Sequence, residues 1–284
     1  MKNSRFKQFE SSVSNIPLDK KSKSLRRTIV RMLEHSRRGH LSPALSLVEI
    51  FRVLYDDVLK YDPANPKWAE RDRCILSKGH GCLALYAILA EKKFFPEEQL
   101  WKFCSKDGIL GGHPEQCKVP GVEASTGSLG HGLSIGIGFA LNARYERMDY
   151  RTFVILGDGE CNEGSIWEGA MCASKHKLDN LTILIDYNKQ QAYASTFEVL
   201  NLEPFADKWK NFGFAVAEVD GHNIKELRNV LADLPFEKDK PNAVICHTVK
   251  GKGIEFIERD LEWHHKSRIN DEEIQAFYKA LGED

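Results

Sequence analysis

Two short apolar runs mark the centre of the chain. Residues 151–156 and 181–186 have the length and the flanks of buried parallel strands. Residues 165–176, between them, have the periodicity of a helix. This βαβ unit predicts an α/β fold, with a parallel sheet and helices on both of its faces.

The same patterns predict the remaining elements. Strands are expected at the start of the segment 72–81, at 215–220 and at 243–249. Helices are expected at 20–38, ending at Gly39, and at 44–59, 82–91, 133–145, 203–213, 223–233 and 271–281. A loop is expected over 189–196.

Polar residues stand where the two central strands end. Gly157-Asp158-Gly159 follows the first strand, and Asn188 follows the second. In open α/β sheets, ligands bind at these carboxyl ends. The two glycines let backbone N–H groups approach an anion, and the start of the next helix adds a favourable dipole. Because Asp158 and Asn188 offer hard oxygen ligands, the pair predicts a metal–diphosphate site, although Gly-Asp-Gly alone is also common in turns.

Composition narrows the classes of function. A chain of 284 residues has room for one large α/β domain or two small ones. We expect an N-terminal arm at 1–18 and one domain at 19–284. The net charge of −1 gives no footprint for nucleic acid, and no apolar run is long enough to span a membrane. The seven cysteines show no Cys-x-x-Cys spacing, and the N-terminus lacks a secretory signal, so we expect a cytoplasmic protein.

Glycine and histidine recur together at four junctions before the first central strand. They are Gly39-His40, Gly79-His80-Gly81, Gly111-Gly112-His113, and the segment 126–132 with Gly127, Leu129 and His131. Each one alone is as well explained by a turn or a surface histidine. Four in series are hard to explain as chance turns, and they predict loops that meet an anion.

These motifs resemble a known family. Gly157-Asp158-Gly159, followed by Asn188 after a spacer of just under thirty residues, resembles the thiamine-diphosphate (ThDP) fingerprint. Gly39-His40, Ser77-Lys78-Gly79-His80, Gly112-His113-Pro114-Glu115 and the segment 126–130 are similar, in order, to the motif series of transketolase. The resemblance spans most of the chain and corresponds to the N-terminal third of a conventional transketolase. It is strongest to the split form, which is encoded by two genes.

The resemblance implies roles for particular residues. The metal, Mg²⁺ with Ca²⁺ or Mn²⁺ as alternatives, would be held by Asp158, Asn188 and the carbonyl of Gln190. The cofactor would contact His80, Gly127, Leu129, Gly157, Asp158, Gly159, Glu160, Glu163, Asn188, Ala192 and His264. The catalytic histidines would be His40, His80, His113 and His264, with His265 as the alternative to the last. Glu163 and Glu168 would lie at a subunit interface.

The resemblance also implies a partner. In this family the glutamate that activates ThDP belongs to a second, pyrimidine-binding domain, and after its last predicted strand this chain has room only for a loop and one helix. We therefore expect an α2β2 assembly with a C-terminal transketolase subunit, transferring a two-carbon ketol unit between sugars or sugar phosphates. Relatives usually carry an arginine where this chain has Phe103-Cys104-Ser105, which favours an unusual ketose. The alternatives are a 2-oxoacid dehydrogenase E1 subunit, a deoxyxylulose-phosphate synthase relative, or a non-catalytic ThDP- or Mg²⁺-binding module.

Overall fold

A five-stranded parallel sheet forms the centre of the molecule, in a computed structural model that describes residues 13, 16–264, 266 and 269–282. The strand order is β1-β2-β3-β5-β4, and every neighbouring pair is parallel. The strands are β1 (Arg73–Leu76), β2 (Thr152–Gly157), β3 (Leu181–Tyr187), β4 (Ala215–Asp220) and β5 (Asn242–His247). The predicted α/β class and all five predicted strands are confirmed.

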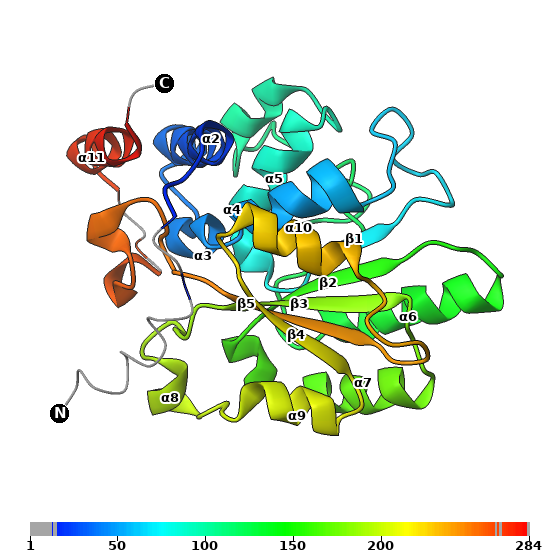
Figure 1. Cartoon of the computed structure of the whole chain (residues 1–284). Coiled ribbons are helices and arrows are strands. Elements are labelled where there is room, and N and C mark those ends of the chain that lie inside the picture. The colour runs from blue at the N-terminus through cyan, green and yellow to red at the C-terminus, as the bar shows by residue number, and fades with distance from the viewer. Residues whose placement is uncertain (1–12, 14–15, 265, 267–268, 283–284) are drawn as a thin grey trace.

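Helices cover both faces of the sheet (Figure 1). One face carries α2 (Lys20–Ser36), α3 (Leu41–Leu45), α4 (Val48–Val53), α5 (Cys82–Glu91), α10 (Ile224–Ala232) and α11 (Asp271–Leu281). The other carries α6 (Gly132–Tyr145), α7 (Gly164–Lys175) and α9 (Phe205–Asn211). Along β2, Phe153 and Ile155 belong to the core of the first face, and Val154 and Leu156 to that of the second. The strand is therefore buried on both sides, as its unbroken apolar run predicts.

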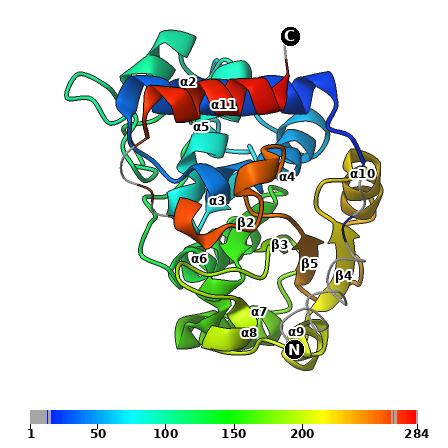
Figure 2. The same ribbon diagram turned by 90° about the vertical axis from the view of Figure 1, so that its left-hand side faces the viewer.

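The first and last described helices lie side by side. α11 packs along α2, as Figure 2 shows in red and blue. Most of the predicted arm at 1–18 lies outside the described residues, and Asp19 caps the start of α2 by accepting a hydrogen bond from the backbone N–H of Ser22. Among the helices of the described residues, none is long and apolar enough to cross a membrane.

Several short helices complete the chain. They are the π turn η1 (Leu54–Val58), the 3-10 helices η2 (Gly79–Gly81), η3 (Glu97–Lys102), η4 (Gly159–Asn162), η5 (Glu255–Ile257) and η6 (Leu261–Trp263), and the short helix α8 (Thr196–Val199). α8 follows the predicted loop at 189–196. It begins at a capping box of Ser195 and Glu198, which gives a physical reason for a helix there.

Two predicted helices need correction. The helix at 20–38 ends at Ser36, because Arg37 takes the left-handed conformation (φ 54°) that was expected at Gly39. The single helix predicted at 44–59 is wrong. The chain breaks between α3 and α4, where the hydroxyl of Ser46 donates to Oδ2 of Asp186 at 2.7 Å, and continues through the π turn η1. Smaller shifts affect the helix at 203–213, which begins at Phe205, and the strand at 243–249, which ends at His247.

Candidate functional site

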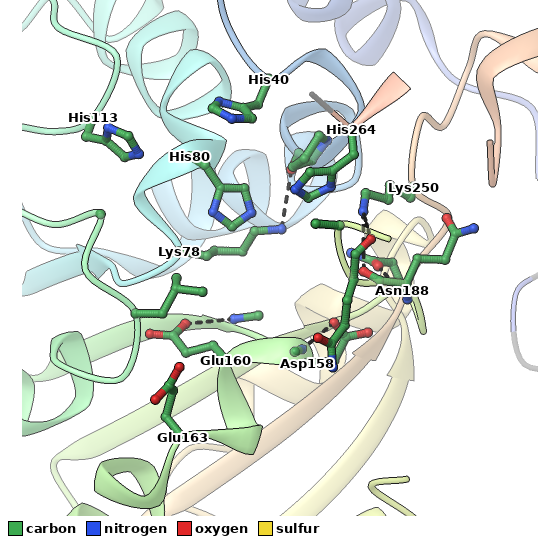
Figure 3. A pocket seen from close by; sticks show the side chains of 18 residues that line it. His40, Lys78, His80, His113, Asp158, Glu160, Glu163, Asn188, Lys250 and His264 are labelled. Carbon is green, nitrogen blue, oxygen red and sulfur yellow. Dashed lines mark hydrogen bonds between the residues drawn. The ribbon is translucent and has the colours of Figure 1, made fainter. Parts of the chain in front are cut away.

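A cavity of about 430 Å³ lies at the carboxyl ends of the central strands. Figure 3 shows four histidines along one side of it and Asp158, Glu160 and Glu163 along the other. Its lining residues are His40, Pro43, Lys78, His80, His113, Gly127, Leu129, Gly157, Asp158, Gly159, Glu160, Glu163, Asn188, Gln190, Gln191, Ala192, Lys250 and His264. Every predicted catalytic, cofactor and metal residue is among them, so motifs spread over 225 positions, from 40 to 264, meet in one place.

Asp158 stands at the end of β2 with its carboxylate held by backbone donors. One oxygen accepts from the N–H of Gly159 at 2.7 Å, and the other from the N–H of Lys189 at 2.5 Å. Burial, and next the charge of Asp186, raise the pKa of Asp158 to about 6. The short helix η4 begins here, at Gly159, whereas α7 begins only at Gly164. The sequence predicted that the dipole of a helix start would favour an anion here. That dipole comes from a single 3-10 turn.

Asp186, at the end of β3, is a buried carboxylate that the motifs did not single out. Burial raises its pKa, but the charge of Lys78 and several hydrogen bonds lower the pKa further, to below its usual value. Its donors are the hydroxyls of Ser46 and Thr248, the ammonium of Lys78, and Nδ2 of Asn188 at 3.2 Å. The only sequence signal for it was a charged residue inside an apolar strand.

Asn188 is oriented by this carboxylate. Because Nδ2 donates to Asp186, the amide oxygen Oδ1 is left to accept, and it receives the backbone N–H of Gln190 at 3.1 Å. Asp158, Asn188 and Gln190 all line the cavity, so it contains a carboxylate, an amide oxygen and a backbone carbonyl. This is the hard oxygen set that Mg²⁺ and Ca²⁺ prefer.

Two buried lysines supply positive charge. Lys78, 2% exposed, pairs with Asp186, and Lys250, 1% exposed, donates to the carbonyls of Gln191 at 2.9 Å and Gln190 at 3.3 Å. Burial, and next the charge of Lys78, lower the pKa of Lys250 to about 8. By composition, the Lys/Gly loop at 250–253 fits either phosphate binding or solvation, and the burial of Lys250 excludes solvation for that residue. Two ammonium groups in a cavity with oxygen donors fit a metal-bound diphosphate.

The four histidines come from four separate segments. The ring centre of His40 lies 5.7 Å from that of His80, 6.3 Å from His113 and 6.1 Å from His264, and His80 lies 5.7 Å from His264. Burial, and next the charge of Lys78, hold the pKa of His80 well below its usual value, so this imidazole is neutral near pH 7. His264 is buried in the lining, and His265 lies outside the described residues.

Glu160 ties the glycine loops together. Its carboxylate accepts from the backbone N–H groups of Gly130 at 2.9 Å and Gly157 at 3.0 Å, and from the hydroxyl of Ser77. Gly127 has a φ of +134°, and a Cβ there would lie 2.7 Å from the ring of His113. Only glycine allows this close approach.

The two predicted interface glutamates differ in position. Glu163 precedes α7 and lines the cavity, whereas Glu168 lies on the exposed side of α7, away from the lining. Their role at a subunit interface stays a prediction.

Comparison with known proteins identifies the domain. Residues 19–284 match the family described as transketolase, thiamine diphosphate binding domain. One subunit of the apulose-4-phosphate transketolase from Phocaeicola vulgatus is 40% identical over 248 residues, which cover 87% of this chain and 88% of that protein. The 6-deoxy-6-sulfo-D-fructose transketolase subunit SqwG of Clostridium sp. is 39% identical over 254 residues, covering 89% and 92%.

Solved structures agree with this assignment. The transketolase from Leishmania mexicana superimposes with a TM-score of 0.86 at 29% identity, over 93% of this chain and 41% of that chain. The transketolase from Campylobacter jejuni gives 0.85 at 28% identity, over 93% and 42%. This chain therefore spans about two fifths of a conventional transketolase but matches nearly the full length of the split-form relatives. It belongs to the transketolase family and corresponds to the thiamine-diphosphate-binding subunit of its split form.

Proposed function

We propose that this chain, together with a C-terminal partner subunit, transfers a two-carbon ketol unit from a ketose to an aldose acceptor. The observation that carries the proposal is the cavity itself. Three oxygen donors, two buried lysines and four histidines line it together. A site for a metal-bound diphosphate thus lies beside a cluster of proton-transferring groups.

The metal would be Mg²⁺, with Ca²⁺ or Mn²⁺ as alternatives, held by Asp158, Oδ1 of Asn188 and the carbonyl of Gln190. Lys78 and Lys250 would face the diphosphate oxygens, since opposite charges attract strongly in a buried site. ThDP, when bound, supplies the electron sink for breaking and forming the carbon–carbon bond. The protein groups of this chain anchor the cofactor and orient the sugar.

The histidines would handle the sugar's protons. His40 and His264 would face the reacting carbonyl and hydroxyl, and His113 the C1 hydroxyl region. A neutral imidazole can accept a proton and return it near pH 7. The depressed pKa of His80, caused by burial and next by Lys78, suits an acceptor that starts neutral.

The partner would supply the pyrimidine-binding domain and the activating glutamate, in an α2β2 assembly that we expect in the cytoplasm. The relatives from Phocaeicola vulgatus and Clostridium sp. are each named as one subunit of a transketolase, which supports a partner chain. Glu163 and Glu168 would lie at the contact between subunits. Relatives named for apulose 4-phosphate and for 6-deoxy-6-sulfo-D-fructose point to an uncommon ketose, as does the segment Phe103-Cys104-Ser105, which lacks the arginine usual in the family.

The test uses the chain with and without the product of a neighbouring gene, in the presence of ThDP and Mg²⁺. Transfer is measured from fructose 6-phosphate, xylulose 5-phosphate, apulose 4-phosphate and 6-deoxy-6-sulfofructose to an aldose. We expect transfer by the pair and none by the isolated chain. Full activity of the chain alone would refute the need for a partner. Turnover of a 2-oxoacid by the pair, without transfer from any ketose, would refute the transketolase reaction.

A further inference from the structure

Three buried polar side chains lie behind the cavity and do not line it in the described part of the chain: Arg26 of α2, Glu49 of α4 and His222 after β4. Arg26 and Glu49 form a bidentate ion pair at 2.6 and 2.8 Å, with exposed fractions of 0% and 1%. Burial raises the pKa of Glu49, but the charge and hydrogen bonds of Arg26, together with the hydrogen bond to His222, lower the pKa further, to well below its usual range. The pair is thus fully ionised inside the protein.

His222 extends this pair toward the cavity. Its Nδ1 lies 2.8 Å from Oε2 of Glu49, and its Nε2 accepts the backbone N–H of Val249 at 2.9 Å. Since Nε2 must accept, the ring proton is on Nδ1, where it donates to the carboxylate. The carboxylate of Glu49 therefore stabilises the tautomer of His222 whose Nε2 can accept the backbone N–H of Val249.

Arg26 holds the other side of the same segment. Its Nε donates to the carbonyl of Lys252 at 2.7 Å. Val249 and Lys252 flank Lys250, so the network forms hydrogen bonds to the backbone before and after that lysine. The backbone N–H of Gly251 adds a third bond, to the carbonyl of Ser42 at 3.1 Å.

The network also reaches the segment that carries His40. Nη2 of Arg26 donates to the carbonyl of Leu45, at the end of α3, at 3.0 Å. α3 begins directly after His40. It includes Ser42, whose carbonyl accepts the hydrogen bond from the backbone N–H of Gly251. One buried ion pair thus joins the Lys250 segment to the helix behind His40.

We propose that Arg26, Glu49 and His222 form a positioning unit that aims the ammonium of Lys250 at the cofactor's diphosphate. The inference rests on the proposed function, because it needs a diphosphate in the cavity. Lys250 is a long side chain with four rotatable bonds, and its ammonium is useful only if its backbone is fixed. His222 acts through Lys250 and touches neither substrate nor cofactor.

The test is a double-mutant cycle on ThDP affinity, measured by calorimetry on the assembled pair of subunits with Mg²⁺. His222→Asn keeps the ion pair of Arg26 and Glu49 but is too short to receive Val249. We expect it to weaken ThDP binding about tenfold in the unchanged background, and less than twofold when Lys250→Met is already present. Such non-additive losses are expected when one residue acts through the other.

Two further variants sharpen the cycle. His222→Gln restores an acceptor for Val249 and should recover most of the affinity. His222→Ser, which is also too short to reach Val249, replaces His222→Asn in the cycle if that variant does not fold. His176→Asn, at an exposed histidine, is the matched control and should change nothing. Equal losses from the His222 variant in both backgrounds, or no loss in either, would overturn the inference. Absence of ThDP binding by the unchanged assembled pair would instead overturn the proposed function, and the inference with it.

Discussion

The two sides of the cavity are built in different ways. The floor, defined here as Asp158, Asp186 and Asn188, stands on the ends of β2 and β3, and each side chain is held by backbone or buried side-chain partners. The wall, defined as His40, His80, His113 and His264, comes from four separate segments, and His113 is exposed. The floor is rigid before any ligand arrives. The wall is where the proposed function places the sugar.

This difference separates anchoring from reaction. Changes in the floor should act on cofactor affinity, and changes in the wall on the rate of transfer with bound cofactor. Each prediction below tests whether the two sides can be separated in this way.

The largest effect is expected from Asp158→Ala. Loss of the carboxylate removes the proposed metal ligand and the acceptor for two backbone N–H groups, so ThDP binding with Mg²⁺ and all transfer by the assembled pair should disappear. Calorimetry and the transfer assay measure this. The cofactor-free chain should change little in thermal unfolding, because relief of a charge that burial and Asp186 disfavour offsets the loss of an acceptor for two backbone N–H groups. Asp149→Ala, at an exposed position, is the control, and retained transfer by the Asp158 variant would reject the metal site.

His40→Asn should lower the rate and leave the anchor intact. We expect kcat to fall by about 10²–10⁴, the usual contribution of a proton-transferring group, while ThDP affinity stays within about twofold. Steady-state kinetics of the pair and calorimetry of the chain separate the two quantities. The matched control is His131→Asn, because His131 also follows a glycine but is exposed and outside the cavity lining. A loss of affinity equal to the loss of rate would show that wall and floor are not independent.

Gly127→Ala tests how the wall is held. A residue with a Cβ at φ +134° would be strained and would meet the His113 ring at 2.7 Å. We expect the free energy of unfolding to fall by about 1–3 kcal/mol, read from denaturant titration, with reduced kcat. Gly138→Ala is the control, because a Cβ there meets nothing within 4 Å, and it should stabilise α6 by up to about 1 kcal/mol. Equal behaviour of the two variants would contradict the close approach at Gly127.

The smallest effect is a pH dependence of the floor. With the pKa of Asp158 at about 6, protons compete with the metal below that pH. Apparent Mg²⁺ affinity in the presence of ThDP should fall up to about tenfold per pH unit below pH 6 and level off above it. The metal-free fold behaves oppositely. Because the folded pKa lies above the unfolded value of 3.8, this group stabilises the fold at low pH and loses that contribution as pH rises toward 6. Calorimetry and urea unfolding between pH 4 and 7.5 follow both trends, and a metal affinity that does not change through pH 6 would contradict the first.

Sequence predicted the parts of this molecule that local patterns encode. The apolar runs indicated β2 and β3. The Gly/His motifs named His40, His80 and His113 of the wall, the resemblance to transketolase added His264, and the ThDP fingerprint named Asp158 and Asn188 of the floor. The predicted strand 215–220 and helix 271–281 match β4 and α11 at both ends. These features depend on residues close together in the chain, so their signals survive without knowledge of the fold.

What local patterns missed depends on distant partners. Lys250 sat in a loop whose composition also fits solvent, and only the fold buries it against Gln190 and Gln191. Asp186 gained its importance from Lys78, 108 residues away. The break after α3 also depends on a distant residue, since the hydroxyl of Ser46 donates to the carboxylate of Asp186, 140 residues away.

The bond from Arg26 to the carbonyl of Lys252 bears on the order in which the protein can be made. Its two ends are 226 residues apart, so this contact closes one of the longest loops in the chain. The ribosome must synthesise β5 and the residues after it before the guanidinium of Arg26 can donate to that carbonyl. Until then, α2 carries a charged side chain that is buried only in the finished fold. Helices and the β2–β3 pairing can form earlier, from nearer contacts. The cofactor pocket is therefore a late product of synthesis, since the segment after β5 must reach α2.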